Sequence, residues 1–304
     1  MDLKSLKVGI VILSWNDPQN TYELVESIFQ SDYQNFDVIV VDNNSKSENF
    51  DKFLSNLKKN NFSYKIISEN EIIQGTQDFS KNIFIIRSIE VSEYNFAENL
   101  GVSRGYNKGI KFVMSNMYKF LVKLDCDFII SKKLISGLIK TFEANRNAVA
   151  VSPKVYYYIN KKTKIIWWKG VNFTKNYFRF QRTGKGADRR VLDEGQFKGI
   201  HKSEGICGCC VMLKTEVIKK TGLLDTDFFF GPEDIEHAFR LKKHGELLVN
   251  LDYYAYHKVS QSIFVSGVKK RIYFETIGWL LLIKKICNTN DRIAGYTYFL
   301  IRGK

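Results

Sequence analysis

Short apolar runs alternate along the chain with longer segments whose apolar residues follow helical spacing. Val8–Leu13 and Val38–Val41 are continuous apolar runs rich in β-branched residues, which is typical of strands buried on both faces. Between them, Asp17 and Pro18 predict the N-cap and first position of a helix. A strand, a helix and a second strand in this order form the βαβ unit of a parallel sheet.

The same alternation predicts the rest of the fold. The first half is expected to be a doubly wound α/β sheet, and residues 154–202, which are rich in aromatic and basic side chains, are expected to form irregular hairpins and loops on the sheet edge. The remaining predicted elements, in chain order, are a helix over 48–60, a strand over 83–86, a helix over 97–115, a strand over 120–124, helices over 210–222 and 233–244, a strand over 248–256 and a helix over 268–285.

Polar clusters follow three of the predicted strands at the point where each strand ends. They are Ser14-Trp15-Asn16, Asp42-Asn43-Asn44-Ser45 and Asp125-Cys126-Asp127. Ligands of open parallel sheets bind at the carboxyl ends of the strands. One aspartate at a strand end is readily explained as a cap or turn former, whereas three aligned clusters favour a binding site. The Asp-x-Asp pair can direct two carboxylates at one divalent cation such as Mg²⁺ or Mn²⁺.

A glycine stripe marks the predicted helix over 97–115. Gly101, Gly105 and Gly109 are spaced by four residues and therefore lie along one side of the helix, so that another part of the molecule can approach its backbone closely. Close packing of the helix on the sheet explains this spacing, and Arg104 adds a guanidinium group that could bind phosphate.

Acidic residues open the predicted helix over 233–244. Glu233, Asp234 and Glu236 favour the helix dipole, which is a purely structural explanation. The functional interpretation is a carboxylate acting as a general base beside the aromatic run Phe228–Phe230. His257 follows the last predicted strand, and a single histidine is more often structural than catalytic.

The charge of the chain is uneven. The 304 residues include 46 Lys and Arg against 32 Asp and Glu, a net charge of +14, and the excess lies in residues 154–202 and 258–304. Such segments can meet nucleic acid, an anionic membrane or a phosphorylated substrate, or can simply be solvated. No helix-turn-helix, zinc-finger or RRM pattern supports nucleic acid. No apolar run reaches the roughly 20 residues of a membrane span, and no signal peptide is visible.

Taken together, these motifs resemble family 2 of the inverting GT-A glycosyltransferases, in its bacterial rhamnosyltransferase-like branch. The resemblance covers nearly all of residues 7–290 and implies a GT-A fold. It implies a catalytic domain over 1–257, with a nucleotide-sugar-binding half (1–153) and an acceptor-binding half (154–257), and a C-terminal helical extension over 258–304. The matching segments are residues 11–16, 40–45, 99–109, 124–127, 222–229, 233–236 and 256–258.

The resemblance also implies roles for individual residues and a bound Mn²⁺ or Mg²⁺. Asp234, in the pair with Glu233, is expected to be the catalytic base, and Asp127, Asp125 and His257 are expected to hold the metal. The residues expected to bind the nucleotide are Ser14, Trp15, Asn16, Asp42, Asn44, Asn99, Arg104 and Asp125, and those expected to bind the acceptor are Asp225, Phe229 and Trp168. Trp15 stands in place of a more usual tyrosine, and Ile277-Gly278 stands where Arg-Asn is common.

The implied donor is a UDP-, dTDP- or GDP-sugar, and the implied acceptor is a glycan or lipid-linked saccharide of bacterial surface polysaccharide assembly, such as capsule or O-antigen. We expect a cytoplasmic protein on the inner face of the membrane. The two basic segments are expected to make a peripheral membrane contact, with Trp279 and Leu280–Leu282 at the interface. Nucleic acid is not expected as a partner, and a homo-oligomer is compatible with the sequence.

Two other classes of protein fit the sequence less well than this interpretation. A sugar nucleotidyltransferase would need a glycine-rich loop with a basic residue after the first strand, where Ser14-Trp15-Asn16 stands instead. A non-catalytic glycan- or nucleic-acid-binding protein would not need the acidic clusters.

Overall fold

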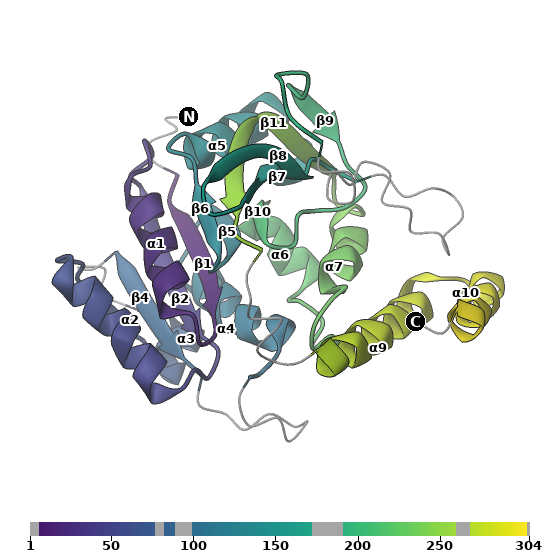
Figure 1. The fold of residues 1–304 in the computed structure, drawn as a ribbon, viewed down its shortest axis with the longest axis horizontal. Coiled ribbons are helices and arrows are strands. Elements are labelled where there is room, and N and C mark those ends of the chain that lie inside the picture. Colours follow the sequence, from purple (N-terminus) through teal and green to yellow (C-terminus); the bar gives the residue numbers. More distant parts are fainter. Residues whose placement is uncertain (1–5, 77–81, 89–98, 172–190, 260–267, 303–304) are drawn as a thin grey trace.

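The fold is a central sheet with helices on both of its faces (Figure 1). A computed structural model describes residues 6–76, 82–88, 99–171, 191–259 and 268–302. The strands are β1 (Val8–Ser14), β2 (Phe36–Asp42), β3 (Lys65–Ile66), β4 (Ile83–Arg87), β5 (Phe120–Asp125), β6 (Phe128–Ile130), β7 (Ala148–Tyr158), β8 (Lys162–Trp168), β9 (Ile200–Lys202), β10 (Cys210–Lys214) and β11 (Glu246–His257). The helices are α1 (Pro18–Phe29), α2 (Ser47–Lys59), α3 (Glu69–Gln74), α4 (Val102–Ser115), α5 (Leu134–Ala144), α6 (Thr215–Thr221), α7 (Glu233–Leu241), α9 (Val268–Ile286) and α10 (Thr289–Arg302).

The strand order of the sheet is β3-β4-β2-β1-β5-β10-β7-β11-β6, with β8 paired to β7 and β9 to β11. The first five strands in this order are parallel, as the apolar runs predict. β10 is antiparallel to both of its neighbours, β5 and β7, whereas β7 and β11 are parallel. The predicted doubly wound, mostly parallel sheet is therefore confirmed.

Two layers of helices bury the two faces of the sheet. Along β1, Ile10 and Ile12 belong to the core cluster under α1, α2 and α5, whereas Val11 belongs to the cluster under α3, α4, α6 and α7. Alternation along a strand sends neighbouring side chains to opposite faces, so a strand covered on both sides must be apolar throughout. This explains why β1 and β2 appear in the sequence as unbroken apolar runs.

The glycine stripe of α4 packs the helix tightly onto the sheet. A Cβ atom added at Gly109 would lie 2.4 Å from Val11 Cγ1, and one added at Gly105 would lie 2.6 Å from Leu13 Cδ1. No real side chain tolerates such contacts, so glycine lets α4 approach the strands. Helix-on-sheet packing, one of the two explanations offered by the sequence, is thus shown for these positions.

Two predicted helices have different limits in the structure. Residues 210–222 form strand β10 followed by α6, because Cys210–Lys214 pairs with two neighbouring strands in the middle of the sheet. The helix predicted over 97–115 begins only at Val102. Gly101 has a φ of +81°, and its backbone N–H donates to Asn99 Oδ1 at 2.7 Å, so the chain turns here before the helix starts.

The edge insertion and the C-terminus are more ordered than the sequence predicts. Within residues 154–202, β7 continues to Tyr158 and pairs with β8, while residues 172–190 of this segment lie outside the described residues. The C-terminal helix over 268–285 is confirmed as α9, and α10 follows it. Of the helices described, none has the length and apolar character needed to cross a membrane.

Helix α9 packs onto α7. Part of the surface that makes this contact is the surface that the sequence predicts to face a membrane. Leu282 is completely buried in a cluster with Phe228 and Ile235, and Trp279 packs against the same cluster. The prediction that Leu282 lies at a membrane interface is therefore wrong. Among the side chains of this region that the structure describes, Ile272, Tyr273 and Ile293 are apolar and face outward, with exposures between 52% and 63%.

Candidate active site

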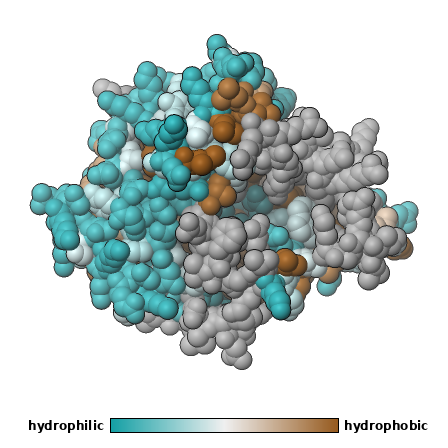
Figure 2. Space-filling view, in the orientation of Figure 1, coloured by the Kyte–Doolittle hydropathy of each residue, from teal (hydrophilic) through white to brown (hydrophobic). Residues whose placement is uncertain are grey.

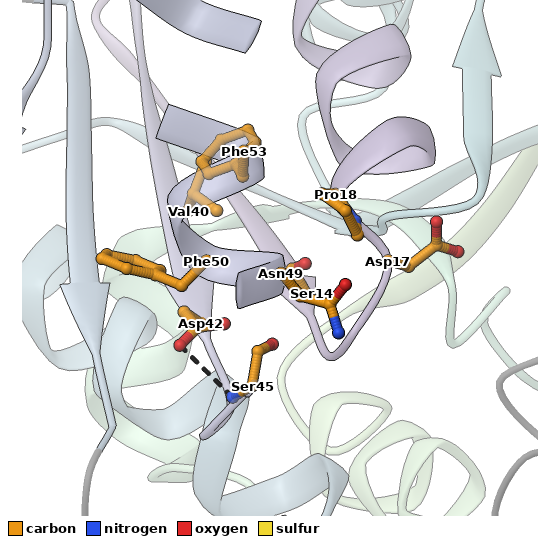
Figure 3. A pocket seen from close by; sticks show the side chains of 9 residues that line it. All are labelled: Ser14, Asp17, Pro18, Val40, Asp42, Ser45, Asn49, Phe50 and Phe53. Atoms are coloured by element: carbon orange, nitrogen blue, oxygen red, sulfur yellow. Dashed lines mark hydrogen bonds between the residues drawn. The ribbon is translucent and has the colours of Figure 1, made fainter. Parts of the chain in front are cut away.

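The first two polar clusters meet at the carboxyl ends of β1 and β2. Ser14 and Asp42 are register partners in the two parallel strands, and Asn43 donates its backbone N–H to the carbonyl oxygen of Ser14 at 2.8 Å. Ser14, Asp42 and Ser45 line a small pocket with the start of α1 and the aromatic face of α2 (Figure 3). The structure thus brings together side chains from both strand ends, as the parallel sheet predicts.

Asn16 links the loops that follow the two strands. Its backbone N–H donates to Ser45 Oγ at 2.8 Å, and its Oδ1 accepts from the Lys46 backbone at 2.9 Å and from Asn49 Nδ2 at 3.0 Å. Asn16 and Asn44 both have positive φ angles, of 53° and 65°, which asparagine tolerates better than most residues. The two asparagines therefore determine the conformation of the loops that follow β1 and β2 in the absence of a ligand.

The Asp42 carboxylate is buried at the floor of this pocket. Burial raises its pKa, whereas hydrogen bonds from Ser45 and the positive charge of Arg87, whose Nε lies 3.7 Å from Asp42 Oδ2, favour the charged form. Arg87 also lies over the Phe50 ring. A buried acceptor at the edge of an aromatic-lined pocket is suited to the polar groups of a nucleoside.

Asn43 connects the loop that follows β2 to the start of α4. Its Nδ2 donates to Asn99 Oδ1 at 2.7 Å and to the Gly101 carbonyl oxygen at 3.1 Å. The sequence predicts a role for Asn99 but assigns none to Asn43. Arg104 lies half-buried in the first turn of the same helix. Apart from Asp125 on β5, the residues predicted for the nucleotide thus come from the ends of β1 and β2 and from the start of α4, which lie at one edge of the sheet.

Asp127, in the turn between β5 and β6, and His257, at the end of β11, form a buried pair. Asp127 Oδ2 lies 3.0 Å from His257 Nε2, and both residues are less than 9% exposed. The imidazole is stacked on Phe128 and meets the edge of Trp167, with ring centroids 4.5 and 4.3 Å apart. These aromatic contacts fix the orientation of the ring. The structure therefore brings together two of the three predicted metal ligands.

Asp125 is engaged elsewhere. Its Oδ1 accepts the hydroxyl hydrogen of the buried Tyr106, and its backbone N–H donates to the carbonyl oxygen of Cys209 at 3.1 Å. Burial raises its pKa, against the opposing effect of the Lys123 ammonium. Over the described part of the chain, no group of three His, Cys, Asp or Glu side chains is arranged to hold a metal ion.

The Asp127–His257 pair itself fits a divalent cation as a two-ligand site. One carboxylate oxygen and one imidazole nitrogen face each other, and the buried Nδ1 of His257 has no hydrogen-bond partner among the described residues. Mg²⁺ prefers oxygen ligands, whereas imidazole suits transition metals, so this donor set favours Mn²⁺ over Mg²⁺. With two protein ligands, other coordination positions are left for groups from a ligand.

On the other side of the site, Asp234 lies against a glycine. A Cβ atom added at Gly208 would lie 2.7 Å from both Cβ and Oδ2 of Asp234. Asp234 Oδ1 accepts from the backbone N–H of Ile235 at 2.9 Å, and the side chain is half-buried. The carboxylate at the start of α7 is therefore held close to the backbone that leads into β10.

Its neighbour Glu233 points into the protein. Glu233 Oε1 lies 3.6 Å from the ammonium of Lys123, which in turn lies 4.2 Å from the centroid of the Tyr106 ring. Burial raises the Glu233 pKa, and Lys123 opposes that rise. Sequence reasoning missed Lys123 and Tyr106. The available signal was a lysine in the otherwise apolar strand over 120–124.

The three residues predicted to bind the acceptor are all engaged within the protein. Trp168 is 8% exposed and belongs to the core, while its neighbour Trp167 contacts His257, because side chains alternate along β8. Trp168, which the sequence assigns to the acceptor, is therefore enclosed in the core, and Trp167 is the tryptophan that borders His257. Asp225 pairs with Lys285, and Phe229 packs on Gly101 and Phe274.

Sequence comparison establishes the family to which this chain belongs. Residues 9–72 and 74–222 match the model of the family described as glycosyl transferase family 2. The chain belongs to this family. No curated protein matches the sequence. The match includes both nucleotide-side strand ends and Asp125–Asp127, and it ends before Asp234.

Solved structures share the GT-A glycosyltransferase fold. GalNAc-T7 with UDP, GalNAc and Mn²⁺ has a TM-score of 0.60 and 14% identity, over 83% of this chain and 43% of that one. The mannosyltransferase PcManGT from Pyrobaculum calidifontis, in complex with GDP-Man and Mn²⁺, has a TM-score of 0.57 and 12% identity, over 97% and 70%. S. aureus TarS has a TM-score of 0.52 and 15% identity, over 86% and 38%.

The chain thus spans less than half the length of two of these neighbours, GalNAc-T7 and TarS. At these identities the similarity shows the fold alone.

Acid is expected to destabilise the protein through His237. Burial, followed by the nearby charges of Arg240 and Lys123, lowers the His237 pKa to about 3 from 6.5. Because the unfolded chain binds a proton that the folded chain excludes, stability falls as the pH drops below about 6.5. The contribution lost between pH 7 and pH 5 is about 2 kcal/mol.

Urea denaturation at several pH values measures this effect. His237→Gln should reduce the loss of stability between pH 7 and pH 5 relative to the wild type, while the control His244→Gln, at an exposed position, should leave it unchanged. Equal pH dependence in the wild type and His237→Gln would contradict the prediction.

Proposed function

We propose that this protein is a metal-dependent, inverting glycosyltransferase that moves a sugar from a UDP-, dTDP- or GDP-sugar to a glycan or lipid-linked saccharide. One observation carries the proposal. Gly208, which contacts Asp234, is followed by Cys209, whose carbonyl oxygen accepts the backbone N–H of Asp125. A candidate base and the donor-side Asp-x-Asp are therefore fixed to the same short stretch of backbone.

The donor would be held by the edge formed by β1, β2 and the start of α4. Asp42 is a buried acceptor for hydroxyl or amide hydrogens, and the loop of Asn16 and Ser45 supplies preorganised polar groups. Binding of GDP-Man by PcManGT and of UDP by GalNAc-T7 supports a nucleotide-sugar donor. The pocket lined by Phe50 and Phe53 would exclude water from one side of the nucleoside.

Asp127 and His257 would hold Mn²⁺, which would stabilise negative charge on the leaving diphosphate. Asp234 would accept the proton of the acceptor hydroxyl as that oxygen attacks the anomeric carbon. A single displacement of this kind inverts the anomeric configuration. A correctly placed base typically raises the rate of such a step by about 10²–10⁴-fold.

We further propose that the acceptor belongs to bacterial surface polysaccharide assembly and is met at the cytoplasmic face of the membrane. The outward side of α9 and α10 carries Ile272, Tyr273 and Ile293 together with the exposed cations Lys284 and Arg292. Apolar and basic side chains in combination favour the surface of an anionic bilayer. By contrast, the α1 and α2 side of the face shown in Figure 2 is hydrophilic.

Replacement of the proposed base is the first test. Asp234→Asn keeps the shape of the side chain but removes its ability to accept a proton, so sugar transfer should fall by about 10²–10⁴-fold while binding of the nucleotide persists. The conservative control Asp51→Asn lies exposed on α2 and should keep full activity. Near wild-type turnover of Asp234→Asn would refute the assignment.

Thermal shift with a panel of UDP-, GDP-, CMP- and dTDP-sugars tests the donor and the metal together. One nucleotide class should raise the melting temperature in the presence of Mn²⁺, and a chelator should abolish that shift and the activity. His257→Asn should lose the Mn²⁺-dependent part of the shift because one of the two ligands is gone. Undiminished activity in chelator would rule out the metal role.

Liposome co-sedimentation tests the membrane contact. The protein should pellet with vesicles that contain anionic lipid at low ionic strength and should be released by salt, because Lys and Arg near the surface each contribute about 1 kcal/mol. Ile272→Ser with Tyr273→Ser should weaken this binding without loss of activity on a water-soluble acceptor. If the protein does not bind anionic vesicles, the membrane contact is refuted and the basic charge contributes to solubility alone.

A further inference from the structure

One face of α9 follows the loop that leads to Asp234. Phe274, Gly278, Leu282 and Lys285 are spaced by four, four and three residues and therefore lie on the same side of the helix. Each of them contacts a residue in the segment 225–235, which continues into the first turn of α7 and is called here the acceptor-side loop.

The contacts at the N-terminal end of this face are close and aromatic. The rings of Phe274 and Phe229 are stacked with their centroids 4.2 Å apart. One turn further, a Cβ atom added at Gly278 would lie 2.0 Å from the carbonyl oxygen of Gly231 and 2.9 Å from Pro232 Cδ. Only glycine allows the backbones of α9 and the loop to approach this closely, which gives a physical reason for the glycine in Ile277-Gly278.

The C-terminal end of the face adds an apolar and an ionic contact. Leu282 is fully buried against Phe228 and Ile235. Lys285 Nζ lies 2.5 Å from Asp225 Oδ2 and 2.8 Å from Asp227 Oδ2, so one ammonium joins two carboxylates of the loop. Burial alone would raise the pKa of Asp225, but Lys285 lowers it below its usual value.

The opposite side of the loop is tied to the donor half. The Phe229 carbonyl oxygen accepts from the backbone N–H of Val102 at 2.7 Å, at the first residue of α4, and the Phe229 ring lies against Gly101. The loop is therefore held between the start of α4 and the length of α9. In Figure 1, α9 runs beside the segment that enters α7.

We propose that α9 positions the acceptor-side loop, with Lys285 and Gly278 as positioning residues that keep Asp234 in place for proton abstraction. This inference rests on the proposed function, because it assumes that Asp234 is the base. It assigns a catalytic purpose to a helix that lies beyond residue 222, where the match to the family model ends. The residues of α9 act through the loop and touch no reacting atom.

Hydrogen exchange provides a test that needs no ligand. Lys285→Met removes both ion pairs, so amides in 225–235 should exchange about threefold to tenfold faster than in the wild type, while those of α1 keep their rates. Lys285→Arg, which keeps the charge, should restore slow exchange. The matched control Lys284→Met changes the neighbouring exposed lysine and should behave as the wild type. Gly278→Ala should loosen the same loop more strongly.

The kinetic counterpart uses the nucleotide sugar that binds in the thermal-shift panel. Lys285→Met should lower kcat about threefold to tenfold with an unchanged KM for the donor, because the donor edge is untouched. Equal exchange in Lys285→Met and Lys284→Met, equal kcat in the two variants, or an exchange increase spread over α1 as well would each overturn the proposal. If Asp234→Asn remains active, the proposed base fails independently of the exchange result.

Discussion

The antiparallel insertion of β10 between β5 and β7 is the constraint on which the site depends. In a purely parallel sheet, the start of a strand and the end of its neighbour lie at opposite edges. Because β10 runs against β5, its start lies beside the end of β5, where Asp125 meets the carbonyl oxygen of Cys209. Gly208 then fits against Asp234, so that the Asp-x-Asp pair and the proposed base meet at one edge of the sheet.

The buried charges reinforce this junction. Lys123 on β5 and Glu233 on α7 are each less than 7% exposed and lie close enough to pair, and Tyr106 on α4 lies between Lys123 and Asp125. Removing one partner of a buried pair leaves a charge uncompensated, which costs several kcal/mol. The relative placement of β5, α4 and α7 is therefore determined by a few polar side chains as well as by apolar packing.

The sequence predicts the parallel half of the fold and the clustering of polar residues at its strand ends because both follow from local patterns. An apolar run ending in Asp42 or Asp125 indicates a strand end, and parallel strand ends share an edge. The sequence cannot show whether Cys210–Lys214 is a strand or part of a helix, because four apolar residues followed by a lysine suit either and the neighbouring strands decide. Lys123 was missed because its partner is distant in the sequence.

The same limit applies to the burial of Trp168. Which of two adjacent tryptophans faces the site depends on the register of β8 against β7, and this register is shifted by irregularities near Tyr156. A shift of one residue exchanges the two faces of a strand, and nothing local in the sequence reveals it. Trp167, rather than Trp168, contacts His257 for this reason.

The packing of α9 also limits how the chain can be divided. Phe228 and Ile235 lie within residues 1–257, the predicted catalytic domain, yet their apolar cluster is completed by Leu282 of α9. A chain cut after His257 would keep every strand of the sheet but would expose this cluster to water. Residues 1–257 would then present an exposed apolar surface close to Asp234, so truncation at the end of the sheet would favour self-association.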